Sequence, residues 1–152
     1  MLLQGTLEPK SRWKIGVVTA RFNHEITERL ESGAYERLLE LGMKGEQILR
    51  VRVPGAVEIP LVAARLLDSG CDAVIVLGAV IQGESKHFDY VCQSVERGCT
   101  HLALTTKKPV IFGVLTTDNE EQAEARVGGA HGHKGRDAAD AAVEMVNLME
   151  ML

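Results

Sequence analysis

Four short apolar runs, separated by longer segments of helical period, most constrain how this chain can fold. The runs are rich in β-branched residues and comprise Lys14–Thr19, Ile48–Val53, Ala73–Val80 and Val110–Thr116. The last two are apolar on both faces, which is typical of parallel strands covered by helices on each side. Strand and helix alternate along the chain. We therefore expect an α/β protein, a three-layer α/β/α sandwich around a four-stranded parallel sheet.

The segments between these runs carry apolar residues at helical spacing. The first stripe ends at Gly42, and after the fourth run Thr117 and Glu120 have the spacing of a capping box. The expected helices are Ile26–Leu41, Val57–Leu67, Val91–Leu102, a short helix up to about Arg126, and Gly135–Leu152. The last helix is expected to carry five apolar residues on one face: Ala138, Ala142, Met145, Met149 and Leu152.

The first residues do not follow this alternation. Residues 1–11 carry no strand or helix pattern of the kind seen later, so they form either a frayed arm or an extra strand added to a neighbouring subunit's sheet. No repeat, low-complexity tract or linker interrupts the remainder. We therefore predict a single domain over residues 12–152.

Composition excludes several classes of function. The chain has 152 residues and a formal net charge of −4, without a basic run, so nonspecific nucleic-acid binding is not expected. It has no apolar stretch long enough to span a membrane and no signal-peptide pattern. Its cysteines, Cys71, Cys92 and Cys99, are odd in number and lack a C-x-x-C spacing. They therefore predict neither a disulfide framework nor a zinc site, and they favour a cytoplasmic location. Cys92 and Cys99 are expected in the core, on one helix face.

The expected sheet also indicates where a ligand would bind. In parallel sheets ligands lie beyond the carboxyl ends of the strands. The segments at those ends are Ala20–Asn23, Pro54–Glu58, Ile81–His87 and Thr117–Asp118. Only six residues of the chain are aromatic, and Phe22 lies in the first of these segments, where a core residue is not expected. We therefore expect Phe22 to offer its ring face, and Asn23 its amide, to a ligand.

Two further features of these segments have both a functional and a structural interpretation. Gly83-Glu84-Ser85 follows a strand and opens a helix, so its N–H groups and hydroxyl suit an anion, although an ordinary helix cap explains them too. His87 in the first turn is a candidate general acid or base, because a helix N-terminus disfavours the imidazolium. A half-buried polar residue is the alternative. Glu58 at the start of the preceding helix likewise has a helix-dipole explanation.

One basic cluster lies between the last two helices. It comprises Arg126, His131, His133, Lys134 and Arg136 in a glycine-rich segment. Arginine can bind a phosphate through two parallel hydrogen bonds, and lysine can add a point charge. The alternative is a solvated connection. His131 and His133 lack a third ligand nearby, so no metal site is predicted.

Four motifs in order resemble the lumazine synthase (6,7-dimethyl-8-ribityllumazine synthase) family. They are ARFN at Ala20–Asn23, VPGAVEIP at Val53–Pro60, GAVIQGESKHFDYV at Gly78–Val91 and PVIFGVLTTDNEEQAEAR at Pro109–Arg126. The resemblance implies a flavodoxin-like fold and an enzyme of riboflavin biosynthesis without a cofactor or metal. Such enzymes condense 5-amino-6-(D-ribitylamino)uracil with 3,4-dihydroxy-2-butanone 4-phosphate and release phosphate and water.

The resemblance also implies roles for individual residues. His87 corresponds to the proposed proton-transfer residue, and the phosphate of the second substrate would be held by Glu84, Ser85 and Arg126. Phe22 would stack on the pyrimidine ring. The other substrate-binding residues would be Asn23, Ala56, Val57, Glu58, Ala79, Val80, Ile81, Phe112 and Lys134, with Phe112 and Arg126 supplied by the adjacent subunit.

Members of this family assemble as pentamers or as shells of sixty subunits, with active sites at the subunit interfaces. The short join between the last two helices favours the shell. The basic segment departs from the family pattern, because Ala130 replaces a lysine and His133 an asparagine. Lys134 still matches the family pattern.

Two other functions are compatible with the same fold. An archaeal-type riboflavin synthase would join two lumazines and would need no phosphate site, which the Gly83–His87 segment and Arg126 argue against. A noncatalytic flavin-binding or shell-forming homologue is the second alternative. A phosphorelay receiver is excluded, because Ala20-Arg21 and Gly78-Ala79 stand where its acidic residues would be required.

Overall fold

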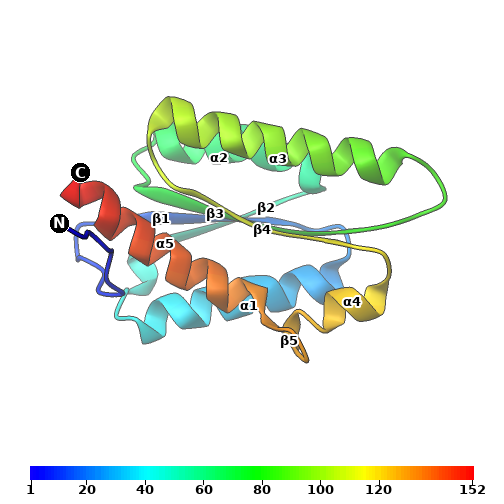
Figure 1. Cartoon of the computed structure of the whole chain (residues 1–152), viewed down its shortest axis with the longest axis horizontal. Coiled ribbons are helices and arrows are strands. Elements are labelled where there is room, and N and C mark those ends of the chain that lie inside the picture. Colours follow the sequence, from blue (N-terminus) through cyan, green and yellow to red (C-terminus); the bar gives the residue numbers. More distant parts are fainter.

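Four parallel strands form the centre of the computed structural model, which describes residues 1–152 (Figure 1). They are β1 (Ile15–Ala20), β2 (Ile48–Val53), β3 (Ala73–Ile81) and β4 (Val110–Thr117), in the spatial order β2-β1-β3-β4. Ile15 pairs with Ile48 on one side and with Ala73 on the other. The sequence-based prediction of a four-stranded parallel sheet is confirmed, with strand ends shifted by a residue or less.

Two pairs of helices cover the sheet, one pair on each face (Figure 1). The pair on one face is α1 (His24–Glu40) and α5 (Lys134–Met151); the pair on the other is α2 (Ile59–Asp68) and α3 (His87–Thr106). The remaining elements are short: η1 (Gly45–Gln47), η2 (Ala56–Glu58), α4 (Glu120–Glu124), β5 (Val127–Gly129) and β6 (Gly132–His133). No helix is both long and apolar enough to cross a membrane.

Alternate strand residues build two cores, one under each helix pair. In β1, Ile15 and Val17 join the core beneath α1 and α5, whereas Val18 and Ala20 join the core beneath α2 and α3. All six residues of β1 are buried, because helices cover both faces of this central strand. Burial of both faces is what the uninterrupted apolar runs predict.

Two predictions about helix starts need correction. Helix α3 begins at His87 rather than at Gly83, so Gly83 to Lys86 form a loop. Helix α4 is capped by Asn119, whose side chain accepts a hydrogen bond from Gln122 N, because Thr117 remains in β4. The capping box assigned to Thr117 and Glu120 is therefore wrong.

The predicted apolar face of the last helix is also wrong in part. Ala138 and Ala142 are buried, but Met145, Met149 and Leu152 are exposed in this chain. The buried face instead consists mainly of small residues: Gly135, Ala138, Ala139, Ala142, Val143 and Val146. The pair of cysteines on α3 is likewise split, since Cys99 is buried and Cys92 only half-buried.

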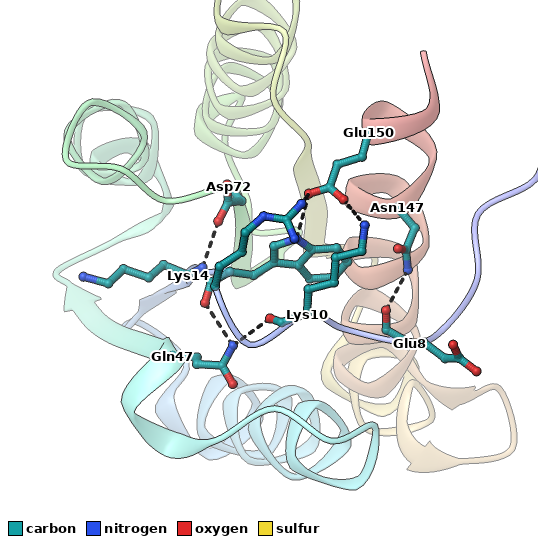
Figure 2. Close-up of polar contacts among 9 residues, drawn as sticks. Glu8, Lys10, Lys14, Gln47, Asp72, Asn147 and Glu150 are labelled. Carbon is teal, nitrogen blue, oxygen red and sulfur yellow. Dashed lines mark hydrogen bonds and ion pairs between the residues drawn. The ribbon is translucent and has the colours of Figure 1, made fainter.

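The first eleven residues form no strand within this chain and lie beside the end of α5 (Figure 2). The Asn147 side chain donates to the carbonyl oxygens of Thr6 and Glu8 at 2.8 and 3.1 Å. Gln47 Nε2 donates to the carbonyls of Lys10, Ser11 and Trp13. Side chains from distant elements thus satisfy the backbone of the segment that leads into β1.

Candidate active site

A cavity of about 550 Å³ opens at the carboxyl ends of β1, β2 and β3. Its volume is within the range of small-molecule sites. Most of the lining is apolar, with a few polar groups. The lining residues are Ala20, Phe22, Pro54, Gly55, Ala56, Val57, Glu58, Ala79, Val80, Ile81, Gly83, Ser85, His87, Phe88 and Val91. Three of the four segments predicted from the strand ends therefore meet at one cavity.

Backbone hydrogen bonds hold the β1–α1 loop against the β2–η2 loop. The N–H of Arg21 donates to the Val53 carbonyl at 2.8 Å, and the N–H of Phe22 donates to the Pro54 carbonyl at 3.1 Å. The Phe22 side chain is nevertheless 72 % exposed, so its position is set by backbone contacts rather than by core packing. A fixed but uncovered ring is available to stack on a flat ligand.

Asn23 anchors the same loop to the central sheet. It adopts a left-handed conformation with φ 62°, which asparagine tolerates better than most residues. Its Nδ2 donates a 2.8 Å hydrogen bond to the Ala79 carbonyl of β3. This amide is thus committed to the protein, and the Ala79 carbonyl with it, so Asn23 positions the loop that carries Phe22.

The end of β3 presents backbone groups to the cavity because β1 stops earlier. The last pair between β1 and β3 joins Thr19 and Leu77, whereas β3 continues to Ile81 beside β4. Gln82 N donates to the Thr117 carbonyl on β4. Since peptide groups alternate sides along a strand, those of Val80 also face β4 and those of Ile81 face the cavity side. Of Val80 and Ile81, Ile81 therefore has the backbone N–H that is available to a ligand in the cavity.

The loop before α3 supplies the polar end of the cavity. His87 is the first residue of α3, and its N–H donates a 3.3 Å hydrogen bond to Ser85 Oγ. Ser85 and His87 line the cavity and are exposed, whereas Glu84 is exposed but does not line it. The N-terminus of this 20-residue helix favours a bound anion through its free N–H groups and dipole.

On the opposite wall, η2 places Ala56, Val57 and Glu58 along the cavity. Ala56 is buried, and Val57 and Glu58 are exposed. The Glu58 N–H donates to the Gly55 carbonyl at 3.3 Å, which closes the turn. The tight turn keeps short side chains and one carboxylate facing the ligand space.

Phe112, Arg126 and Lys134, which were also predicted as site residues, do not line this cavity. Arg126 and Lys134 border a separate hollow of about 380 Å³ along β4, together with His131 and Asp137. Arg126 Nη1 donates to the Gln122 carbonyl at 2.7 Å. Phe112, in the edge strand β4, is half-buried against the core beneath α2 and α3. One chain thus contains two separate groups of predicted site residues.

Sequence reasoning did not single out Phe88 and Val91, which also line the cavity. Val91 lies four residues after His87 on α3, on the same helix face, and this spacing could have indicated it; Phe88 directly follows His87 and has no such signal. Nor did it assign a structural role to His133, which caps α5: its Nδ1 accepts from the Arg136 N–H at 3.3 Å. Burial and the neighbouring Arg136 lower the pKa of His133 below its ordinary value. No group of three or more His, Cys, Asp or Glu residues is gathered closely enough to hold a metal ion.

A parallel sheet with an apolar cavity at its carboxyl edge and a helix start beside it is the arrangement of the α/β proteins that bind small molecules at this edge. Comparison with known proteins gives the particular family. Residues 12–150 match the 6,7-dimethyl-8-ribityllumazine synthase family. The chain belongs to this family.

Individual relatives agree over most of the chain. The chain is 54 % identical to the 6,7-dimethyl-8-ribityllumazine synthase of Coxiella burnetii over 142 residues, which cover 93 % of this chain and 94 % of the relative. Identity to the protein of the same name from Desulfatibacillum aliphaticivorans is 47 % over 98 % of this chain and 96 % of the relative. The enzyme of Bdellovibrio bacteriovorus is 54 % identical over 90 % of this chain and 75 % of its own length.

Proposed function

We propose that the cavity beside Phe22 is the active site in which this enzyme of riboflavin biosynthesis forms 6,7-dimethyl-8-ribityllumazine. The substrates are 5-amino-6-(D-ribitylamino)uracil and 3,4-dihydroxy-2-butanone 4-phosphate. One observation carries this assignment: the exposed Phe22 ring and the exposed His87 imidazole line the same cavity. The two residues are 65 positions (87 − 22) apart in the chain. The proposed reaction requires no metal ion.

The pyrimidine substrate would lie on Phe22, between the β1–α1 loop and η2. Ala79, Val80 and Ile81 would border the heterocycle. Ile81 would contact it through its free peptide groups, and Val80 through its side chain. Ala56, Val57 and Glu58 would follow the ribityl chain. Asn23 would contribute by holding the loop, since its Nδ2 is bound to the Ala79 carbonyl.

The phosphorylated substrate would bind at the start of α3. Ser85 and the helix N–H groups would hold the phosphate, with Glu84 beside them and with Arg126 and Lys134 supplying positive charge. The amine of the pyrimidine attacks the ketone to give an imine with loss of water, phosphate is eliminated, and the ring closes with loss of a second water. Because amine and ketone react unaided, much of the acceleration would come from holding them in register. His87 would transfer protons between these steps.

The active site would be completed by a second subunit. Phe112, Arg126 and Lys134 lie outside the cavity of their own chain, along or beside the edge strand β4. A neighbour that packs this edge against the cavity would bring Phe112 and Arg126 to the substrates. We accordingly propose that the chain assembles as pentamers. We further propose a shell of sixty subunits, because the join between α4 and α5 is short, with only nine residues (134 − 124 − 1). Sedimentation velocity distinguishes a monomer, a pentamer and a shell.

The reaction itself is the decisive test. Purified protein is mixed with both substrates, and formation of the fluorescent lumazine is followed against a blank without protein. We expect turnover above the blank and one phosphate released for each lumazine formed. A rate equal to the blank would contradict the proposed function.

A second test isolates the phosphate subsite. Inorganic phosphate at millimolar concentration should raise the melting temperature, because a ligand of the native state stabilises it by mass action. Sulfate-free chloride buffer of equal ionic strength is the control. An unchanged melting temperature would contradict the phosphate subsite but not the reaction.

We also propose that the enzyme acts in the cytoplasm. Its three cysteines are unpaired, and two of them are buried as free thiols. Burial raises the pKa of Cys99 to about 11, so this thiol stays protonated and unreactive. Fractionation of the source cells, followed by the lumazine assay, tests the location.

A further inference from the structure

The helix that follows the Arg126 segment begins on a histidine. His133 occupies the N-cap position of α5, and its Nδ1 accepts a hydrogen bond of 3.3 Å from the Arg136 N–H. Asparagine, aspartate, serine and threonine are the usual caps, and their oxygens accept a hydrogen bond at any pH near neutrality. An imidazole can accept only while Nδ1 carries no proton. This cap therefore exists in one protonation state of the side chain.

The His133 ring packs against α1. It lies against Gly33 in the middle of α1, where an added Cβ would come within 2.1 Å of the ring Cε1. The helices are equally close nearby, since a Cβ at Gly135 would lie 2.2 Å from the Leu30 carbonyl oxygen. The half-buried ring thus packs against the backbone of α1 close to where α1 and α5 meet. Its hydrogen bond to the Arg136 N–H joins the ring to the first turn of α5.

Backbone hydrogen bonds connect this cap to Arg126. The N–H of Lys134 donates to the Arg126 carbonyl at 2.8 Å, and His133 pairs with Val127 in the β5–β6 hairpin. Arg29 of α1 fixes the same hairpin by donating to the Val127 carbonyl at 2.7 Å. The backbone at Arg126 and Val127 is therefore held by hydrogen bonds from Lys134 and Arg29 and by pairing with His133.

Charged groups of both signs surround the ring, and its burial, not their balance, is the main factor against protonation. On its own helix are Arg136 and Asp137, and on α1 are Glu25, Glu28, Arg29 and Glu36. Burial and the nearby Arg136 lower the pKa of His133, with a smaller contribution from Arg29, while a backbone hydrogen bond of His133 and the charge of Asp137 raise it; the net shift is downward. The neutral imidazole, the form that caps α5, is therefore the form that the folded protein favours.

We propose that His133 is a positioning residue for the phosphate subsite, whose neutral imidazole holds the Arg126–Lys134 segment in place and whose protonation releases it. This inference rests on the proposed function only in taking Arg126 and Lys134 as phosphate ligands. When the ring gains a proton, Nδ1 becomes a donor facing the donor N–H of Arg136. The cap is then lost, and the first turn of α5 and the hairpin loosen together.

The sign of the pH dependence follows from the shift. Because the pKa of His133 is lower in the folded than in the unfolded chain, its contribution is present above about pH 6.5, the ordinary histidine value. It is lost as the pH falls through the lower pKa of the folded state. Phosphate-substrate binding should therefore weaken on the acid side only.

The test compares the wild type with His133→Asn, which supplies a cap that does not titrate, and with His133→Ala, which supplies none. The KM for 3,4-dihydroxy-2-butanone 4-phosphate and kcat are measured from about pH 5.5 to about pH 8. The exposed His101 on α3 provides a matched control, His101→Asn. The ratio of wild-type KM to His133→Asn KM cancels titration of the substrate phosphate and of His87, which are common to both proteins.

We expect this KM ratio to rise about threefold to tenfold toward acid pH, with a smaller change in kcat. His133→Ala should show a raised KM at every pH, and His101→Asn should follow the wild type. A ratio that is constant with pH would overturn the proposal.

A measurement without variants keeps the proposal testable if His133→Asn does not fold. Nitrogen NMR of histidine-labelled wild type at about pH 7.5 should find His133 neutral, with the proton on Nε2. A proton on Nδ1 would overturn the proposal whatever the kinetics. Absence of lumazine formation by the wild type would instead contradict the proposed function, and the tautomer would still decide the role of His133.

Discussion

The indole Nε1 of Trp13 donates a 2.9 Å hydrogen bond to Glu150 Oε1, joining the entry to β1 with the last turn of α5. Lys10 and Arg12 form ion pairs with the same carboxylate. Trp13 is only 1 % exposed, so its ring closes the end of the core while its polar edge reaches this carboxylate. One acidic residue thus receives three donors from the N-terminal segment.

These contacts predict an acid-sensitive stability. The hydrogen bond from Lys10 and then that from Trp13 lower the pKa of Glu150 to about 2. Because this value is below the ordinary glutamate value of about 4.3, the contribution is present above about pH 4.3 and lost as the pH falls toward 2. Glu150→Gln should lower the free energy of unfolding at neutral pH, and the difference from wild type should shrink in acid.

Urea unfolding at several pH values measures this difference. Glu144→Gln on the same helix, whose side chain makes no ion pair, provides a matched control that should unfold like the wild type. A Glu150→Gln difference that stays constant between neutral and acid pH would contradict the assignment.

Replacing Phe22 should impair binding without destabilising the fold. Because the ring is 72 % exposed, Phe22→Ala removes little buried area. The lost stacking of about 0.5–1.5 kcal/mol corresponds to a rise of about twofold to twelvefold in KM for the pyrimidine substrate. Phe22→Tyr should retain the wild-type KM. Equal KM values for the alanine and tyrosine variants would exclude a stacking role.

Asn23 should matter to both stability and activity, through two separable effects. Asn23→Gly keeps the left-handed φ of 62° but loses the 2.8 Å bond to the Ala79 carbonyl, whereas Asn23→Ala loses both. We expect the alanine variant to be less stable than the glycine variant by about 1 kcal/mol, the cost of a left-handed conformation for a residue with a Cβ. Thermal unfolding of the two variants measures this difference. The opposite order of stability would contradict the role of the loop conformation.

Arg126 and His87 should affect different kinetic parameters. Arg126→Ala should raise KM for the phosphorylated butanone by about tenfold to a hundredfold, as expected for a lost charged hydrogen bond. His87→Ala should mainly lower kcat, near or below the lower end of the usual range of about 10²- to 10⁴-fold, because the amine and ketone react unaided. Steady-state kinetics with each substrate varied in turn separates the two. Equal, small effects of both variants on both substrates would contradict these roles.

Mixed assembly tests the shared site directly. If Arg126 acts in the neighbouring subunit's cavity, then Arg126→Ala and His87→Ala chains, refolded together, should exceed the kcat/KM expected from the average of the two variants alone. One of the two kinds of mixed interface pairs an intact cavity, from an Arg126→Ala chain, with an intact Arg126 from a His87→Ala chain. Two variants that do not complement one another would place both residues in the same chain's site.

The sheet and much of the cavity could be predicted because both depend on local patterns. Apolar runs such as Ala73–Val80 are buried on both faces wherever they are placed in a parallel sheet, and strand ends then fix the binding edge. Phe22, Ser85 and His87 followed from this rule and line one cavity. The family motifs assigned the same residues.

The predictions that failed depend on close approach between elements. The large residues Met145 and Met149 give α5 an apparent apolar face, yet α5 packs closely on α1 where Gly135 meets the Leu30 carbonyl. At that distance only small side chains fit, so alanines and valines are buried and the methionines are exposed. Thr117 was likewise assigned as a cap, but pairing with Ile81 keeps it in β4.

The sequence alone determined the layer architecture, the family and the binding edge, because hydrophobic period and motif order are properties of the chain itself. The tertiary structure decided which residues share a cavity and which do not. It separated Arg126 and Lys134 from the Phe22 cavity, and it turned His133 from a loop residue into the cap of α5. Distances between residues remote in the chain depend on packing of whole elements, and local patterns do not encode that packing.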